Sequence, residues 1–277
     1  MVRSGQGPEH MASFPRTLAR LTARWLLRLL LTLALLLAGP AYMLAFGDLQ
    51  FERSWRGMDR AAAGLAPDPR EIPEAVVQVY AARAFNWRGV FAVHTWIAVK
   101  PEGGSAYTRY EVTRWRRVST STHGGAPDRA WFGNPPTLLT ELRGASAAEA
   151  IPAIERAVAG YPFASRYQAW PGPNSNTFTA WIVRQVPALR VEFPPTAIGK
   201  DYWQTGMFAR APSGTGIQFA LRGVIGVTLA RTEGMELNVL GLVVGVDPLR
   251  PAVKIPGVGR IGMDGGGREG DPDPAIP

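Results

Sequence analysis

A serine stands near the middle of the chain, where a helix is expected to begin. Residues 170–178 read WPGPNSNTF, a rigid glycine–proline approach followed by small polar residues. Ser175 or Asn174 is predicted to cap this helix by accepting a hydrogen bond from one of its first amides. The alternative is that Ser175 is a nucleophile, because the positive end of a helix favours a developing anion. A cap needs nothing further, whereas a nucleophile needs a base.

His94 is the candidate base. It lies in an apolar run that is predicted to form a strand, where a lone histidine is more often a hydrogen-bonded core residue. A hairpin with the next strand would bring Tyr110, Glu111 or Thr113 beside it, and Glu111 is the side chain expected to orient the imidazole. The other interpretation of Glu111 is an ordinary cross-strand partner of an arginine. The enzyme hypothesis assigns Ser175 as nucleophile, His94 as general base and Glu111 as orienting acid.

Further polar and aromatic side chains are candidates for a substrate groove. Buried aromatic residues are ordinarily part of a core, and a lysine beside an aspartate is ordinarily a surface ion pair. The candidates for substrate contact are Asn174, Asn176, Trp170, Trp96, Lys200 and Asp201.

The composition excludes several other kinds of site. The 277 residues contain no cysteine, which rules out disulfides, thiolate metal sites and a cysteine nucleophile. The 3 histidines follow no HExxH or similar spacing, so we expect neither a metal nor another cofactor. The formal net charge of +8 is not gathered into one basic stripe with exposed aromatics, so we do not expect nucleic acid as a partner.

An uncharged apolar run follows a basic N-terminal segment. Residues 29–46 read LLLTLALLLAGPAYMLAF, and together with residues from 25 onward they are about long enough to cross a bilayer as a helix. A cleaved signal peptide is the main alternative, but Pro40 and the hydrophobicity through Phe46 favour an uncleaved anchor. The positive-inside rule predicts a cytoplasmic N-terminus and a periplasmic remainder at the inner membrane.

The rest of the chain predicts an α+β domain, built of a mostly antiparallel sheet with a few helices. The runs 75–82, 89–99 and 106–118 are rich in valine and aromatic residues or alternate in polarity, so they predict three strands. The turn-forming residues 101–105 make the last two strands a hairpin. A chain of 277 residues requires no second domain.

Two helices are expected among these strands. Ser146 and Glu149 form a capping-box pattern, and the helix that they start is expected to stop at Gly160. The second helix begins near Ser175 and ends before Pro187.

Two glycine-punctuated apolar runs follow, at 216–230 and 235–246. Each is too short or too interrupted to span a membrane. We expect buried or membrane-facing strands that are joined as one hairpin.

These observations divide the chain into five segments. We expect a cytoplasmic basic segment at 1–24, a transmembrane anchor at 25–46, a linker at 47–73, an exported α+β domain at 74–262 and a disordered tail at 263–277.

The order of histidine strand, polar strand and helix start resembles that of circularly permuted papain-like proteins, the NlpC-type and lecithin:retinol acyltransferase-like hydrolases and acyltransferases. Asn174 and Ser175 match their Asn-Cys dipeptide, with serine in place of cysteine. The resemblance implies a papain-like fold and acyl transfer. A hydroxyl ionises far less readily than a thiol, so a serine variant needs a base in direct contact. The alternative is a scaffold that has lost its chemistry and kept a binding groove.

Five longer segments are similar to an uncharacterised bacterial envelope family, domain of unknown function 3750. The resemblance implies a membrane-associated protein of a Gram-negative bacterium and brings no activity. The segments are FAVHTWIAVKP at 91–101, YPFASRYQAWPGPNSNTFTAW at 161–181, PPTAIGKDY at 194–202, APSGTG at 211–216 and GVDPLRP at 245–251.

Two hypotheses of function follow. One is a membrane-anchored hydrolase or acyltransferase acting on an ester or amide in peptidoglycan, lipoprotein or lipid. The other is a catalytically inactive membrane-tethered module that holds a ligand or partner in the same cleft. The distance from the Ser175 hydroxyl to the His94 ring separates them, because a serine nucleophile must lie within hydrogen-bond reach of its base.

Overall fold

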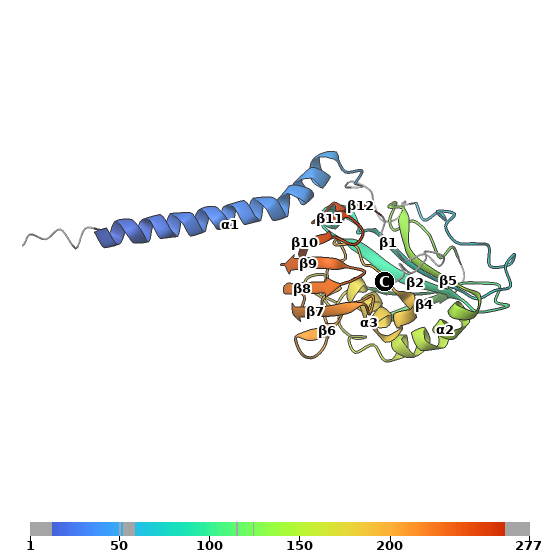
Figure 1. Ribbon diagram of the computed structural model, residues 1–277. Helices are drawn as coiled ribbons and strands as arrows, with labels where there is room; N and C mark the ends of the chain where they lie inside the picture. The colour runs from blue at the N-terminus through green and yellow to red at the C-terminus, as the bar shows by residue number, and fades with distance from the viewer. Residues whose placement is uncertain (1–12, 50, 52–58, 115, 124, 264–277) are drawn as a thin grey trace, which may run out of the picture.

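The computed structural model describes residues 13–49, 51, 59–114, 116–123 and 125–263. Within them, a long N-terminal helix projects from a domain that contains two antiparallel sheets and a few shorter helices (Figure 1). The predicted α+β class with an N-terminal apolar helix is confirmed. The predicted tail falls outside the described residues from 264 onward.

Helix α1 spans Ser13–Phe46 and contains the apolar run that the sequence assigns to a membrane anchor. Its segment Leu18–Phe46 is long and apolar enough to cross a membrane. Most of the large apolar side chains of this segment are exposed, so the domain does not provide the apolar environment that they require.

The first sheet has five strands, and every neighbouring pair is antiparallel. Its order is β4-β3-β2-β1-β5, so the predicted hairpin lies at its centre. The strands are β1 (Val76–Arg83), β2 (Val93–Lys100), β3 (Thr108–Thr113), β4 (Arg116–His123) and β5 (Pro136–Arg143).

Two of the predicted strands are shorter than expected. The run 89–99 becomes a strand only at Val93, because a 3₁₀ helix, η1 (Asn86–Val90), takes up its beginning. The run 106–118 is divided into β3 and β4, which pair with each other. Alternating polarity predicts extended backbone but does not show where a strand turns back on itself.

Two helices cover one face of this sheet. They are α2 (Gly144–Ala159) and α3 (Ser175–Gln185), and a short 3₁₀ helix, η2 (Pro187–Leu189), follows α3. Ile154 of α2, Phe178 of α3 and Ile97 of β2 are each fully buried in the core between helices and sheet. This packing fixes α3 directly against β2.

Helix α2 does not use the predicted capping box. It begins at Gly144, immediately after β5, and Arg143 is its N-cap. Ser146 therefore lies inside the first turn, and its hydroxyl donates to the carbonyl of Arg143 at 2.9 Å. The helix ends at Gly160, where the sequence predicts the stop.

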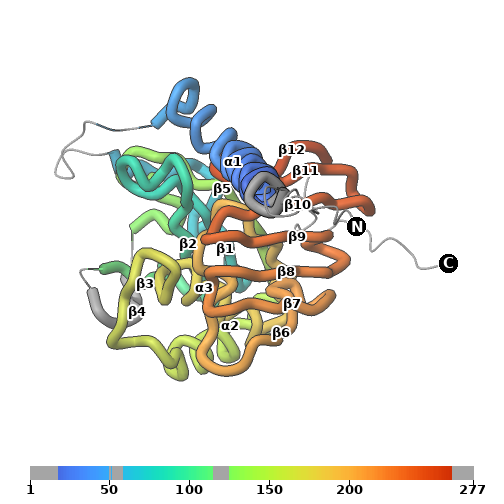
Figure 2. The backbone as a smooth tube through the Cα atoms, turned by 90° about the vertical axis from the view of Figure 1, so that its left-hand side faces the viewer, coloured from blue at the N-terminus to red at the C-terminus, as the bar shows by residue number. Residues whose placement is uncertain are grey.

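A second sheet of seven strands follows in chain order. The two apolar runs do pair through the predicted turn, as β8 and β9, but the expectation of one strand per run is wrong. Each run folds into a hairpin of its own, with Gly223 and Gly241 at positive φ in the turns. Figure 2 looks along α1 and shows this sheet broadside. The strands are β6 (Phe208–Arg210), β7 (Gly216–Leu221), β8 (Ile225–Ala230), β9 (Gly234–Val239), β10 (Leu242–Asp247), β11 (Ala252–Ile255) and β12 (Gly259–Gly262).

Candidate functional site

Helix α3 begins in a dense set of hydrogen bonds around Asn174. The side-chain oxygen of Asn174 accepts hydrogen bonds from the backbone amides of Asn176 at 3.0 Å and Thr177 at 3.1 Å. The Thr177 hydroxyl accepts from the Asn174 amide at 3.1 Å, which completes a capping box. The side-chain nitrogen of Asn174, Nδ2, donates to the backbone carbonyls of Ala169 and Ile198, both at 3.0 Å. Of the two predicted caps, the structure selects the asparagine.

Ser175 lies in the first turn of α3, beside a bridge to the sheet. The bridge is Asn176, whose side-chain nitrogen donates to the carbonyl of Val93 at 3.0 Å. Its side-chain oxygen accepts from the Thr95 hydroxyl at 3.0 Å, and the same hydroxyl lies 3.4 Å from the carbonyl of Ser175. The start of α3 is therefore bound to the Thr95 side of β2.

His94 lies on the other side of that strand. Successive side chains of a strand point to opposite faces of the sheet, so Thr95 faces α3 while His94 faces away from it. The His94 ring stacks on Trp131, with centroids 3.6 Å apart and 9° between the planes. Trp131 and Trp96 belong to a second core cluster, separate from the cluster that contains Phe178.

The structure therefore contradicts the expected contact between Ser175 and His94. No hydrogen bond joins the two side chains, both of which lie in the described part of the chain, and the five-stranded sheet separates them. The reason is the alternation of side chains along β2. Thr95 is the residue that contacts the start of α3, so its neighbour His94 points to the opposite face. Of the imidazoles whose side chains the structure describes, none lies within hydrogen-bond reach of the serine.

Glu111 contacts His94 as the hairpin predicts. The Nε2 of His94 lies 3.1 Å from Oε2 of Glu111, and each side chain is only 6 % exposed. The other carboxylate oxygen lies 3.2 Å from Nη2 of Arg109 and 3.5 Å from Nη2 of Arg129. Glu111 thus contacts the histidine and also pairs with two arginines, but neither arginine is a cross-strand partner, because Arg109 belongs to the same strand and Arg129 lies between β4 and β5.

This environment sets the protonation of the pair. Burial lowers the pKa of His94, although the hydrogen bond with Glu111 opposes the shift. Burial alone would raise the pKa of Glu111, but the hydrogen bond from His94 and the charges of Arg109 and Arg129 lower it to about 2. At neutral pH a neutral imidazole donates from Nε2 to a carboxylate, and the pair is a buried polar connection within the second core cluster.

Five of the six predicted substrate contacts lie in the interior, because Asn174 and Asn176 at the start of α3 are buried as well. Trp96 is 1 % exposed, and its indole nitrogen donates to the carbonyl of Pro127 at 2.8 Å. Lys200 and Asp201 are 1 % and 3 % exposed, with internal partners for both charges. The structure corrects the expectation that these five side chains face a substrate, and it also corrects the alternative of a surface ion pair.

Trp170 is the predicted contact that remains open to the surface. Its side chain is 48 % exposed, while its indole nitrogen donates to the carbonyl of Leu240 at 2.8 Å. This bond connects the approach to α3 with the β9–β10 turn of the second sheet. A half-exposed aromatic ring held in this way forms a fixed contact surface.

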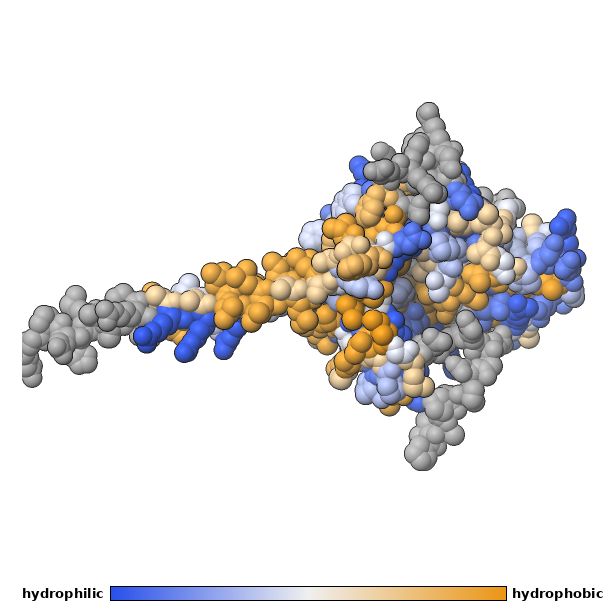
Figure 3. Space-filling model, turned by 90° about the horizontal axis from the view of Figure 1, so that it is seen from above, coloured by the Kyte–Doolittle hydropathy of each residue, from blue (hydrophilic) through white to orange (hydrophobic). Residues whose placement is uncertain are grey.

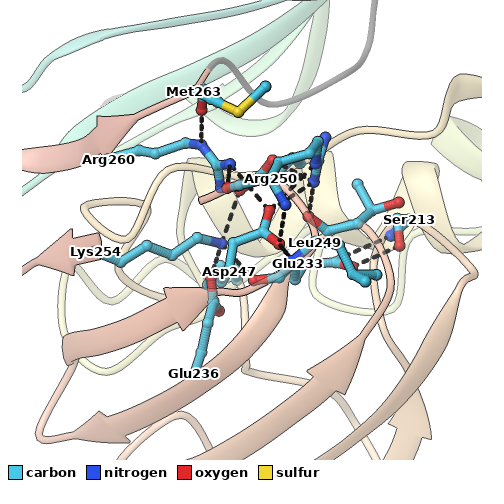
Figure 4. Close-up of polar contacts among 12 residues, drawn as sticks. Ser213, Glu233, Glu236, Asp247, Leu249, Arg250, Lys254, Arg260 and Met263 are labelled. Atoms are coloured by element: carbon cyan, nitrogen blue, oxygen red, sulfur yellow. Dashed lines mark hydrogen bonds and ion pairs between the residues drawn. The ribbon is translucent and has the colours of Figure 1, made fainter. Parts of the chain in front are cut away.

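A buried ionic network, which no sequence motif predicted, lies beneath the second sheet. The Nζ of Lys200 lies 2.5 Å from Glu236, and the Nζ of Lys254 lies 2.6 Å from the other oxygen of the same carboxylate. Lys254 also pairs with Glu192 at 2.8 Å. Figure 4 shows Lys254 and Glu236 together with the adjoining pair of Arg260 and Asp247, at 2.9 Å.

The network favours the charged forms of Lys200 and Glu236. Burial opposes the charge of Lys200, but Glu236 and Asp201 outweigh it and raise the pKa of the lysine. Burial likewise opposes ionisation of Glu236, but Lys200 and Lys254 lower the pKa of this carboxyl group. A buried charge is tolerated when it is paired and hydrogen-bonded, as each of these is.

The sequence did contain a signal for the inward side of this sheet. Gln218, Thr228, Glu236 and Asn238 recur at alternate positions between apolar residues, and all four are buried. Period-two alternation with the polar set inside is the reverse of an ordinary half-exposed sheet. The pattern was hard to recognise because glycines interrupt it, so that each pair of strands has the composition of one long apolar run.

Residues 74–202 match the model of a family described as "Protein of unknown function (DUF3750)". The match confirms the predicted similarity to this family over that segment of the chain. The DUF3750 segment contains the five-stranded sheet, α2, α3 and every candidate site residue, and it ends before β6. No curated protein and no solved structure matches the chain, and the resemblance to permuted papain-like proteins stays a prediction.

Replacement of the helix cap tests the geometry around α3. We expect Asn174→Ala to lower the free energy of unfolding by about 2–4 kcal/mol, because it removes a capping box and the side-chain donor to the Ala169 carbonyl, while the Ile198 carbonyl keeps Asn176 as a donor. Ser175→Ala is the matched control, with an expected loss of about 1 kcal/mol or less. Urea unfolding of the full chain in detergent, followed by tryptophan fluorescence, measures both. Equal losses would contradict the assignment of the cap.

The low pKa of Glu111 predicts an acid-sensitive core. A folded pKa of about 2 against an ordinary value of 4.5 corresponds to about 3 kcal/mol of stability. Because the folded pKa is depressed, this stability is present above pH 4.5 and is lost as the pH falls toward 2. Glu111→Gln should lower stability at pH 7 and flatten its decline over this range.

The matched control for this carboxylate-to-amide change is Glu155→Gln on the exposed side of α2. It should leave both the stability at pH 7 and the acid decline as in the parent chain. Unfolding free energies from urea titrations at successive pH values provide the comparison. An unchanged acid decline in Glu111→Gln would show that Glu111 is not the group responsible.

Proposed function

We propose that the chain is a membrane-tethered module of the cell envelope that holds a ligand or partner and does not carry out serine chemistry. The observation that supports this most is the placement of His94 on the sheet face opposite Ser175. A serine hydroxyl requires a base in direct contact to become a nucleophile, and α3 offers its serine none. The two side chains are also 5 % and 4 % exposed, so neither is open to a substrate.

The tether in this proposal is α1. We place its basic N-terminal part in the cytoplasm and the domain in the periplasm, with a single crossing of the inner membrane. The support is the positive charge of Arg20, Arg24 and Arg28 ahead of the uncharged run, since arginine-rich flanks stay on the cytoplasmic side. The domain is thereby held at the membrane, within reach of peptidoglycan, lipoproteins and lipids.

Trp170 is the candidate contact for such an envelope ligand. Among the predicted substrate contacts, it combines exposure with a fixed indole ring, as described above. Aromatic rings of this kind contribute large contact areas at low cost in conformational entropy. The ring belongs to the DUF3750 segment and is bonded to the β9–β10 turn of the second sheet, so a ligand there would contact both.

A reactive-serine probe tests the absence of serine chemistry. We expect the full chain in detergent to show no more labelling by a fluorophosphonate than its Ser175→Ala variant, because no base activates the hydroxyl. In-gel fluorescence compares the two, with His94→Ala as a further variant and a known serine hydrolase as the positive control. Labelling of the parent chain that disappears in both variants would overturn the proposal and favour the hydrolase.

A further inference from the structure

The outward side of the second sheet is apolar from strand to strand. Register pairs Ile217 with Leu229, Val227 with Leu237 and Val246 with Val253, and all six side chains point away from the interior. They are between 39 % and 63 % exposed. We call this surface, on the outward side of β7–β11, the apolar face.

The inward side of the same strands carries the charges. Glu236 and Lys254 belong to the buried ionic network, and Gln218 and Asn238 both donate to the buried Asp201. An antiparallel sheet with one side in water ordinarily has its apolar residues inside and its polar residues outside. This sheet has the opposite polarity, so its outward side suits an apolar neighbour.

The anchor leaves the domain on the side to which the apolar face points. Helix α1 projects away from β7–β10 in Figure 1, and Figure 2 looks along the helix onto the broad side of the sheet. Figure 3 shows apolar surface continuing from the helix onto the domain at its base. A membrane crossed by α1 therefore lies in front of the apolar face.

The length of the anchor brings this membrane into contact with the domain. The uncharged run 29–46 of α1 would be about 27 Å long at 1.5 Å per residue, close to the thickness of a hydrocarbon core of about 30 Å. Its second half, however, packs on the domain, since Leu36 is 6 % exposed and a Cβ at Gly39 would meet the carbonyl of Pro256.

The part of the run that projects free of these contacts is 29–35, about 10 Å of helix. That is about a third of a hydrocarbon core. Even with residues 25–28, which include Arg28 with its long side chain, the free part is only about 16 Å long, so the helix fills the core only if its second half also lies in the bilayer. The domain residues beside it, at the β11–β12 turn, then lie at the membrane surface or below it.

We propose that the apolar face rests on the lipid bilayer, in the leaflet on the side of the domain, with α1 crossing beside it. The inference depends on α1 being the tether of the proposed function. The edge of the face carries matching groups, because Arg222 and Arg231 are exposed at the two ends of β8. Arginines there meet anionic headgroups, and the half-exposed Trp170 suits the interface between lipid and water.

The absence of cysteine allows a direct test by single-site labelling. The full chain, with one cysteine carrying an NBD fluorophore, is reconstituted in phosphatidylethanolamine and phosphatidylglycerol vesicles. Leu237→Cys reports on the apolar face, Leu33→Cys on the anchor and Glu155→Cys on exposed α2, away from both. Doxyl-labelled lipid and aqueous iodide serve as quenchers, and circular dichroism checks the fold of each variant.

We expect doxyl lipid to quench NBD at positions 237 and 33 several-fold more than at 155, with iodide showing the reverse order. Quenching by lipid at 33 but by iodide at 237 would overturn the inference and leave the tether intact. Protection of 237 from both quenchers would overturn it in favour of a second copy of the chain on this face. Absence of lipid quenching at 33 would contradict the proposal that α1 crosses the membrane, and with it the proposal that the apolar face rests on the bilayer.

Discussion

The alternation of side chains along β2 is the constraint on which the site depends. Thr95 bonds to Asn176 and fixes the start of α3 on one face of the sheet. Its neighbour His94 must then point to the other face, where Trp131 and Glu111 enclose it. His94 is thus only one residue along the strand from the contact with α3, but it lies on the opposite face of the sheet from Ser175. The chain has the components of a serine–histidine pair without their contact.

The second sheet follows from a different constraint, the pairing of buried charges. Lys200, beside the end of the DUF3750 segment, is balanced by Glu236 of β9, and Lys254 of β11 shares the same carboxylate. Removal of one partner from such a pair is strongly destabilising, because a lone charge is left in the interior. The network therefore holds the polar side of the sheet inward. The apolar residues of the same strands are left to face outward, on the side from which α1 emerges.

The sequence predicts the parts of the fold that depend on near neighbours. The α+β class, the start of α3 and its stop before Pro187 follow from caps, breakers and periodicity, and the contact of His94 with Glu111 follows from a short hairpin. The contact of Ser175 with His94 could not be predicted, because it joins elements 81 positions apart and depends on which face of β2 receives the helix. The burial of Lys200 depends on strands that lie later in the chain.

The most direct test of the face assignment is disulfide cross-linking in this cysteine-free chain. The double variant Thr95→Cys with Asn176→Cys places two thiols where side-chain atoms lie 3.0 Å apart, and His94→Cys with Ser175→Cys places them on opposite faces. Under mild oxidation, we expect the first pair to form a disulfide and the second to remain as free thiols. Efficient cross-linking of the second pair, with none in the first, would contradict the account and restore the serine–histidine pair.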